Sequence, residues 1–444
     1  NQTGTFLYRA TRIGKDTVLW RIIELVKKAQ NSKPSISRLV DRISWYFVPS
    51  VIICAIITAL IWYDIGPSPQ VLYMLITGMT VLIIACPCAL GLGTPLSIMV
   101  GVGSAAERGI LIRNGDALQS TKKITTVIFD KTGTITQGKP SVTKIISLSD
   151  ESEDNLLQIA ASLEIGSEHP LAEAIKTAAK EQHLTLLQIT DFQNLTGLGV
   201  IGTIKSHSVM LGNKKLLTKM DVPLENFSQK NDEAATVIYI VRDKKIIGLI
   251  FITDPVKPES ISAIERLHQM NIKTIMITGD NEITASKIAK EVKIKEFFSE
   301  LLPGDKLQII KKQQLKGEIV AMVGDGINDA PALAQANIGY AIGSGTDIAM
   351  ESADITLMNS SLNNIADSII ISNATMRNIK QNLFGAFIYN MMGIPIAAGI
   401  LYPFINLLLN PMIAGAAMAF SSVTIVLNAN RLRGIIRNLI TTPE

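Results

Sequence analysis

Four apolar stretches limit what this chain can fold into. Each has about as many residues as the roughly 20 that a helix needs to cross a lipid bilayer, or more. They are Trp45–Tyr63, Val71–Val100, Leu383–Tyr402 and Phe404–Asn428. Hydrophobic residues make up 47% of the chain and charged residues 18%, which is too apolar for a disordered protein. We therefore predict a membrane protein with four transmembrane helices.

The charges that flank these stretches predict their orientation. Residues 64–70 and the very short turn expected after Tyr402 contain no Lys or Arg. The opposite ends carry Arg38, Arg42, Arg108, Arg113, Lys122, Lys123, Arg377, Lys380, Arg431 and Arg433. Positive charge favours the cytoplasmic side, so residues 103–376 are predicted to be cytosolic. The same asymmetry disfavours the alternative, four buried core helices of a soluble protein.

The cytosolic part alternates strand and helix patterns. Three short apolar runs, Ile124–Phe129, Lys273–Ile277 and Ile319–Val323, each precede a helical pattern, which predicts a doubly wound parallel α/β sheet. An insertion near residues 142–252 has its own strands and helices and is predicted to be a second, α+β domain. The formal net charge of +4 and the lack of a basic block give no reason to expect a nucleic-acid partner.

The three apolar runs end in polar clusters that suit phosphoryl transfer. Asp130 follows the first run, at the strand end where reacting groups gather in open α/β sheets, and a carboxylate can attack a phosphoryl group. Thr278 and Asp325 follow the other two runs, and Lys306 lies between them. Lys and hydroxyl groups can hold developing charge, and Asp130 with Asp325 offers oxygen ligands to Mg²⁺. The remaining cluster members are Gly279, Asp280, Asn328 and Asp329, and Asp280 and Asp329 are expected in structural turns.

At these residues the chain resembles the P-type ATPases, which are built on a haloacid-dehalogenase-like fold. The resemblance implies that Asp130 is phosphorylated and that Mg²⁺ is bound by Asp130, the Thr132 carbonyl and Asp325. It also implies that Thr278 and Lys306 contact the phosphoryl group. A membrane-anchored phosphatase of the same superfamily is an alternative, but such enzymes usually have a second Asp where this chain has Thr132.

The insertion carries three short motifs: Glu168 and His169, Gly197 and Gly199, and Gly212 and Asn213. Alone, a His before a Pro is usually a helix-start residue. Together the motifs resemble the ATP pocket of the heavy-metal branch of the family, in which the His and Glu hold the adenine end and the glycines allow close backbone approach. Gly197, Gly199 and Gly202 also match a dinucleotide pattern, but a strand-like run follows them instead of a helix.

The second apolar stretch contains Cys86, Pro87 and Cys88. Pro87 cannot donate a hydrogen bond to the Ile83 carbonyl, so it should break the helix. Residues two apart on an ideal helix point about 200° away from each other, so the break would let both sulfurs face one site. Thiolates favour Cu(I) or Zn(II), although two buried cysteines in an apolar helix are the simpler alternative. The tripeptide also resembles the mark of the heavy-metal branch.

The last two apolar stretches bear on the choice of metal. Met418 and Ser422 share a helix face, and Tyr389 and Asn390 lie mid-segment. Met in a membrane helix is often only packing, but the last stretch has no Asp, Glu or Lys before Arg431. A divalent ion would favour such a countercharge despite its insertion cost of about 2.5–3.5 kcal/mol. Neutral donors beside Cys86 and Cys88 therefore favour Cu⁺, and these residues resemble the motifs of the copper subgroup.

The expected function is ATP-driven export of monovalent copper through an aspartyl phosphate, with ATP, Mg²⁺ and Cu⁺ bound. The alternatives are a pump for silver, zinc or cadmium, and a non-transporting fragment that only binds metal and ATP. The family's Thr-Gly-Glu loop and further helices would lie upstream, since Thr3-Gly4-Thr5 is not that loop. Taken alone, the chain is expected to be phosphorylated but not to complete a transport cycle. Expected partners are membrane lipid, a soluble metal carrier and an N-terminal part of the same protein, in a bacterial inner membrane.

The predicted division of the chain follows from these features. Residues 1–40 are expected to be a remnant of the actuator domain with a linker helix, and residues 433–444 a cytosolic tail. The first two membrane helices lie in 41–102 and the last two in 377–432. The phosphorylation domain comprises 103–141 and 253–376, and the nucleotide-binding domain 142–252.

Overall fold

The computed structural model separates into two compact units. Unit 1 comprises residues 1–125, 317–321 and 330–444, and unit 2 comprises residues 126–316 and 322–329. The structure describes residues 34–86, 88–167, 169–195, 198–223, 235–325, 329–343 and 353–441, with isolated positions between 20 and 30. Most of the predicted actuator remnant and of its linker helix lies outside the described residues.

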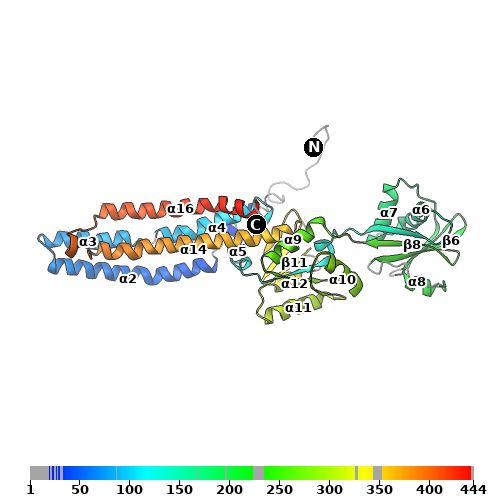
Figure 1. The fold of residues 1–444 in the computed structure, drawn as a ribbon, viewed down its shortest axis with the longest axis horizontal. Coiled ribbons are helices and arrows are strands. Elements are labelled where there is room, and N and C mark those ends of the chain that lie inside the picture. The colour runs from blue at the N-terminus through cyan, green and yellow to red at the C-terminus, as the bar shows by residue number, and fades with distance from the viewer. Residues whose placement is uncertain are drawn as a thin grey trace, which may run out of the picture. The chain divides into compact units, whose positions relative to one another are not determined.

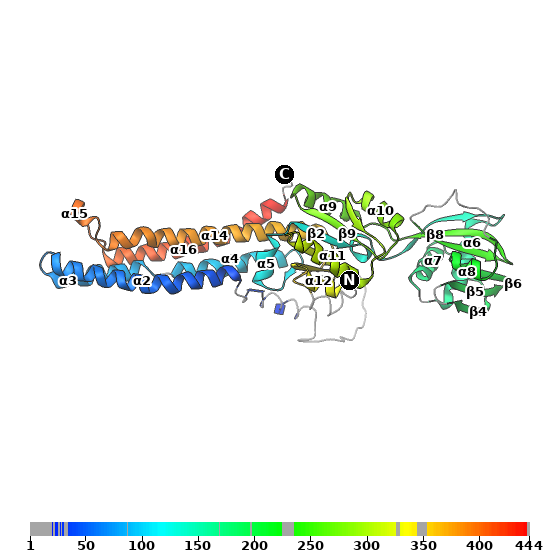
Figure 2. The same cartoon turned by 90° about the horizontal axis from the view of Figure 1, so that it is seen from below.

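Long helices dominate unit 1 (Figure 1). Helix α3 packs against α2, and α4 packs against both α14 and α16. Figure 2 shows the same helices side by side after a turn of 90°. Their bounds are α2 Ser35–Ile65, α3 Gln70–Ile84, α4 Cys88–Ala106, α14 Asn363–Ala397 and α16 Pro411–Thr441.

Two of the described helices are long and apolar enough to cross a membrane. They are α2 and α16, each 31 residues long, with mean hydropathies of 2.1 and 1.7. The predicted second span is divided into α3 and α4, which leaves two shorter apolar helices around the Cys86 segment. The predicted third span is only the second half of α14. The prediction of four spans is therefore confirmed for two helices.

The expected very short turn between the last two spans is wrong. Helix α14 ends at Ala397, a four-residue helix α15 (Tyr402–Ile405) follows, and α16 begins only at Pro411. Gly399 has a φ of +91°, and a Cβ there would lie 2.5 Å from the Trp62 ring. A glycine turn packed against Trp62, and prolines that favour helix starts, lengthen the connection.

A seven-stranded sheet has the order β1-β13-β12-β11-β2-β9-β10. Among the described pairs of this sheet, β2–β9, β9–β10 and β12–β13 are parallel, as the alternating pattern predicts, and β1–β13 is antiparallel. The strands are β1 Ile110–Ile112, β2 Thr126–Asp130, β9 Lys273–Ile277, β10 Glu296–Phe298, β11 Val320–Gly324, β12 Ile338–Ile342 and β13 Ile355–Leu357. The helices between them are α5 Gly115–Thr121, α9 Pro258–Gln269, α10 Glu282–Glu291, α11 Pro303–Leu315 and α12 Ala330–Gln335.

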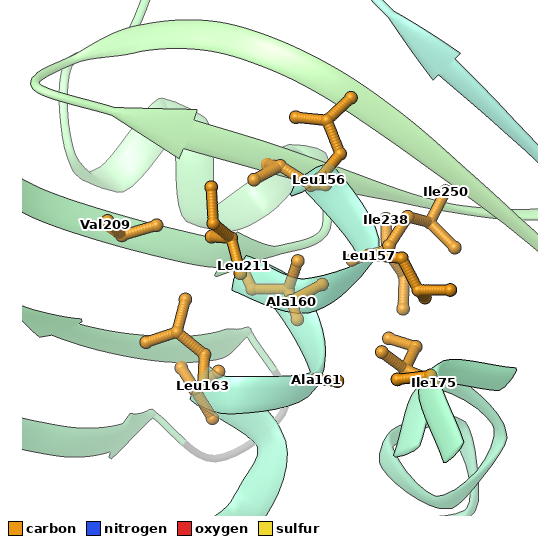
Figure 3. Packing of buried hydrophobic residues seen from close by; sticks show 14 of the residues in the cluster. Leu156, Leu157, Ala160, Ala161, Leu163, Ile175, Val209, Leu211, Ile238 and Ile250 are labelled. Atoms are coloured by element: carbon orange, nitrogen blue, oxygen red, sulfur yellow. The ribbon is translucent and has the colours of Figure 1, made fainter. Parts of the chain in front are cut away.

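The insertion forms a six-stranded antiparallel sheet of order β3-β8-β7-β6-β5-β4. Leu156 and Ala160 of α6 pack with Leu211 and Ile250 of the sheet and with Ile175 of α7 (Figure 3). Spacings of three and four place these helical residues on one buried face. The elements are β3 Ser141–Ser147, α6 Glu153–Leu163, α7 Pro170–Glu181, β4 Thr190–Leu195, β5 Gly199–Ile204, β6 His207–Gly212, α8 Lys214–Lys219, β7 Thr236–Arg242 and β8 Lys245–Thr253.

Candidate active site

Asp130 ends a fully buried strand. All five residues of β2 are buried, and the Asp130 side chain follows the apolar run to the carboxyl end of the sheet. One carboxylate oxygen, Oδ2, accepts a hydrogen bond from the Thr132 N–H at 3.1 Å. The other, Oδ1, accepts one from Lys306 Nζ at 2.7 Å. The carboxylate is thus held in a defined orientation at the strand end.

Lys306 joins two buried carboxylates into one cluster. Its Nζ also donates to Asp329 Oδ1 at 2.7 Å, and Asp329 is 1% exposed. We call Asp130, Lys306 and Asp329 the carboxylate–lysine cluster. Burial, followed by the charge of Asp329, raises the pKa of Asp130 to about 6, although Lys306 acts in the other direction. Burial alone would lower the pKa of Lys306, but the two carboxylates raise it. Asp329, which the sequence places in a structural turn, therefore also bonds to Lys306.

The donor set around Asp130 fits a magnesium ion. Asp325 follows β11, and its charge contributes to the raised pKa of Asp130, so the two carboxylates are close. A Cβ on Gly133, whose φ is +71°, would lie 4.0 Å from Asp325 Oδ2. Three carboxylates against Lys306 leave a local charge of about −2, and carboxylate oxygens are the ligands that Mg²⁺ prefers. The predicted third ligand, the Thr132 carbonyl, belongs to the same loop.

Strand β9 brings Thr278 to this edge of the sheet. Asp130 pairs with Ile277 across the parallel strands, so Thr278 is the next residue beyond the pair. Thr278 is buried, and its Oγ1 accepts a hydrogen bond from the Asp280 N–H at 3.1 Å, which closes the turn around Gly279. Asp280 also forms an ion pair with Lys131, so its role exceeds that of a turn residue. The predicted Asn328 lies outside the described residues.

Two residues near the loop that follows Asp130 were not predicted. Lys257 Nζ donates to the Gly133 carbonyl at 2.8 Å, and burial lowers the pKa of Lys257. Asp254 accepts hydrogen bonds from the N–H groups of Gly138 and Lys139 at 3.2 and 3.1 Å. Both residues follow β8, where the chain returns from the insertion. The end of the insertion was therefore the feature of the sequence that could have pointed to them.

The inserted sheet carries a pocket of about 430 Å³. Four of the six predicted nucleotide residues line it, namely His169, Gly199, Gly212 and Asn213. A Cβ on Gly199 would lie 2.1 Å from the Leu211 carbonyl oxygen, and one on Gly212 would lie 2.4 Å from that of Leu198. Glycine is therefore required by the close approach of the strands. The other two predicted residues, Glu168 and Gly197, lie outside the described residues.

Two ionisable side chains meet at this pocket. His169 begins α7, and its Nδ1 accepts a hydrogen bond from the Leu171 N–H at 3.2 Å, which leaves the proton of the neutral ring on Nε2. Glu164 was not predicted. It is buried, burial raises its pKa, and its Oε2 has no hydrogen-bond partner among the described residues. A buried acceptor without a partner in a pocket marks a ligand-facing group, and no sequence pattern pointed to Glu164.

The predicted metal residues are only partly brought together. Cys86 follows α3 where the helix ends, and Met418 packs on the cluster that contains Ile84 and Ala85. A Cβ on Gly393 would lie 2.7 Å from Ile84, so α14 packs closely against the end of α3 here. The buried Asn390 is one helical turn from Gly393 and therefore lies near this end of α3.

The other predicted metal residues are not shown at one centre. Tyr389 is 43% exposed and lines a different pocket, between α14 and α16. The Ser422 hydroxyl donates to the Met418 carbonyl. Pro87 and the side chain of Cys88 lie outside the described residues.

Comparison with known proteins agrees with this fold. Residues 124–337 match the family model of the haloacid dehalogenase-like hydrolases, and residues 306–369 match a second model of the same description. The parallel sheet and the carboxylate–lysine cluster thus define a haloacid dehalogenase-like hydrolase domain.

Longer similarities extend over nearly the whole chain. It is 49% identical to a copper-exporting P-type ATPase of Vibrio cholerae, over 98% of this chain and 48% of the relative. It is 45% identical to a silver exporting P-type ATPase of Salmonella typhimurium, over 98% of this chain and 53% of the relative. The crystal structure of a zinc-transporting PIB-type ATPase in an E2·Pi state matches with a TM-score of 0.78 at 33% identity, covering 94% of this chain and 68% of the other.

These similarities identify the family of this chain. The chain belongs to the heavy-metal-transporting P-type ATPases. It spans about half the length of the curated relatives it matches, from 48% to 60% in the examples from Vibrio cholerae and Legionella pneumophila.

Proposed function

We propose that this chain is the catalytic and ion-binding part of a pump that exports monovalent copper at the expense of ATP. The observation that carries the proposal is the carboxylate–lysine cluster, a buried carboxylate at a strand end with a lysine 2.7 Å away. The bacterial relatives support a location in the inner membrane, with residues 103–376 in the cytoplasm. The four-span arrangement and the domain division predicted from sequence are part of the proposal.

The phosphoryl transfer uses Asp130 as nucleophile. Its carboxylate oxygen attacks the γ-phosphorus of ATP, the bond from that phosphorus to the β,γ-bridging oxygen breaks, and ADP leaves with the electron pair. Lys306 holds the carboxylate and faces the charge that develops on the phosphoryl oxygens, while Thr278 offers a hydroxyl at the same edge. Mg²⁺ held by Asp130, Asp325 and the Thr132 carbonyl would neutralise phosphate charge. Asp130 must be ionised to react, so its raised pKa limits the reaction at low pH.

The pocket of the inserted sheet is proposed to bind the nucleotide. Gly199 and Gly212 leave the backbone uncovered, and Glu164 and His169 offer an acceptor and a donor at one end. An adenine presents an exocyclic amine and ring nitrogens, which match such a pair. Glu168, Gly197 and Asn213 complete the proposed set.

Monovalent copper is the proposed substrate of the membrane part. The proposed donors are Cys86, Cys88, Tyr389, Asn390, Met418 and Ser422. They include two kinds of soft sulfur, thiol and thioether, and no carboxylate. Names of relatives support copper, and those of the silver and zinc transporters keep other soft metals as alternatives. A soluble metal carrier is proposed to deliver the metal ion. A further, N-terminal part of the same protein is proposed as a partner of this chain.

Metal-dependent phosphorylation tests the proposal. The chain, in lipid vesicles with Mg²⁺ and γ-labelled ATP, is expected to take up acid-stable, hydroxylamine-labile label. Asp130→Asn should reduce the label by at least about 10³-fold, because the amide is a poor nucleophile. Asp221→Asn is the matched control, since Asp221 has a φ of +52° that Asn tolerates and lies away from the cluster.

The metal arm decides between the candidates. Cu⁺ should change the phosphoenzyme level at lower concentration than Zn²⁺, and Cys86→Ser should remove that response but not the label. Label that persists in Asp130→Asn contradicts the nucleophile. A stronger response to Zn²⁺ than to Cu⁺ contradicts the choice of copper.

A further inference from the structure

A second pocket, with several polar residues in its lining, lies among the long helices of unit 1. It has a volume of about 340 Å³ and opens between α14 and α16. Gln381, Asn382, Tyr389, Asn428 and Arg431 supply its polar lining. Of these residues, only Tyr389 belongs to the proposed metal donors. The amides and the guanidinium, which lie between two largely apolar helices, have no role in the proposed metal site.

The inner wall of this pocket is held in place by hydrogen bonds across three helices. Asn428 Nδ2 donates to Asn382 Oδ1 at 2.8 Å, and Asn382 Nδ2 donates to Ser97 Oγ of α4 at 3.1 Å. Asn378 Nδ2 donates to the Asn428 carbonyl at 2.9 Å. We call Ser97, Asn378, Asn382 and Asn428 the amide cluster. Because these amides satisfy one another, the wall is preformed and does not need a ligand to hold it.

The outer rim of the pocket is basic and lacks counter-ions. Arg431 lines the pocket, and Arg377 lies one turn from Gln381 on the same face of α14. In the part of the chain that the structure describes, neither arginine forms an ion pair, and the Gln381 side chain has no hydrogen-bond partner. By contrast, Arg433 on α16 is paired with Glu107 at 2.6 Å. The rim therefore offers two guanidinium groups and an amide to an anion.

The surroundings of the pocket are apolar. Phe384 of α14 and Phe420 and Leu427 of α16 are each more than 60% exposed, on the helices whose polar residues form the pocket. Arginines at the cytoplasmic ends of membrane helices meet the headgroup layer, where anionic lipids gather. A ligand with a phosphate for the rim and hydrocarbon for the flanking side chains satisfies both observations.

We propose that the pocket between α14 and α16 binds the phosphate headgroup of an anionic phospholipid from the cytoplasmic leaflet. Arg377, Gln381 and Arg431 hold the phosphate oxygens, and the acyl chains lie along Phe384, Phe420 and Leu427. The amide cluster keeps the two helices at the spacing that the headgroup needs. The inference rests on the proposed membrane insertion of α14 and α16, but not on which ion is transported.

Spin-labelled lipids test this site in the full chain. In phosphatidylcholine vesicles, labelled phosphatidylglycerol should be immobilised in preference to labelled phosphatidylcholine. The double variant Arg377→Gln/Arg431→Gln should lower that preference by about 5-fold for each arginine, the worth of a basic residue near an anionic surface. Arg437→Gln removes the same charge from an exposed position of α16 outside the pocket and should keep the preference.

Further arms separate the possible failures. Gln381→Glu keeps both arginines and should also lower the preference, which covers the case of a double variant that does not fold. Equal immobilisation of the two lipids by the original chain overturns the site, as does an equal loss in Arg437→Gln. Inorganic phosphate that abolishes the preference at millimolar concentration would show that a soluble anion, and not a lipid, occupies it. A chain that does not float with vesicles would contradict the proposed membrane insertion itself.

Discussion

The carboxylate–lysine cluster and the amide cluster are both buried and polar, but they meet the cost of burial by opposite means. The first consists of two carboxylates and one ammonium, a charge of −1 before Asp325 is added. The second has no charge at all, and its amides and hydroxyl are bonded to one another across α4, α14 and α16. The carboxylate–lysine cluster thus has an unbalanced negative charge, whereas the amide cluster is neutral and self-sufficient in hydrogen bonds.

This difference teaches what each region is built to do. Excess negative charge in a buried site favours a divalent cation, which the proposed phosphoryl transfer needs, and it raises the pKa of a neighbouring carboxyl. Charge among apolar helices costs several kcal/mol, whereas paired amides cost little. Adding or removing a single charge, or removing a single hydroxyl, tests this comparison.

The largest effect is expected on removing the only cation of the first cluster. Lys306→Met leaves Asp130 and Asp329 buried without a cation between them, so the free energy of unfolding should fall by about 3–5 kcal/mol. Thermal unfolding followed by circular dichroism measures this. Lys312→Met, an exposed lysine on the same helix α11, should change little. In Lys306→Met/Asp329→Asn much of the stability should return without any phosphorylation; a double variant as unstable as the single one would contradict the charge explanation.

Adding a charge to the second cluster should cost nearly as much. Asn382→Asp places a carboxylate among amides and apolar side chains, with an expected loss of about 2.5–3.5 kcal/mol. Asn382→Leu, which only removes hydrogen bonds, should cost less, and Asn430→Asp at an exposed position of α16 is the control for added charge. Urea unfolding in detergent compares the three. If Asn382→Asp and Asn382→Leu were equally stable, the neutrality of the cluster would have no energetic meaning.

The raised pKa of Asp130 predicts a pH dependence of stability. The folded chain holds this proton more tightly than the unfolded chain, whose carboxyl has its ordinary pKa, so stability is greatest at low pH and falls as pH rises towards about 6. Without Mg²⁺, the fall between about pH 4.5 and about pH 6.5 should be about 2 kcal/mol and should level off above that. Subtracting the profile of Asp130→Asn isolates this group, and Asp221→Asn should retain the fall. A flat difference profile would show that Asp130 has no raised pKa.

The smallest effect concerns the hydroxyl of the amide cluster. Ser97→Ala removes the acceptor of Asn382, but Asn382 Nδ2 also reaches Asn378 Oδ1 at 3.2 Å. The expected cost is about 0.6 kcal/mol, the average for a hydrogen bond between membrane helices. Ser50→Ala on α2, whose hydroxyl bonds only to the Tyr46 carbonyl of its own helix, is the control. A loss as large as that of Lys306→Met would mean that the amide cluster is not self-sufficient.

Much of the fold was open to prediction because local patterns decide it. The predicted runs Ile124–Phe129, Lys273–Ile277 and Ile319–Val323 became β2, β9 and β11. The errors fall where distant contacts decide. Gly399 packs against Trp62 and lengthens the connection between α14 and α16, and no local pattern near either residue announces that contact.

The sequence by itself determined the chemistry available: a carboxylate, a lysine and a threonine after apolar strands, and sulfur and amide donors within apolar helices. Residue type and period are enough for this, because strand ends in a parallel sheet share an edge and helix faces repeat every three or four residues. Only the tertiary structure decided that Lys306 bridges Asp130 to Asp329, that Glu164 lines the pocket of the inserted sheet, and that Tyr389 and Arg431 line one pocket. Those outcomes depend on side chains far apart in the chain, whose burial together sets their charge, partners and accessibility.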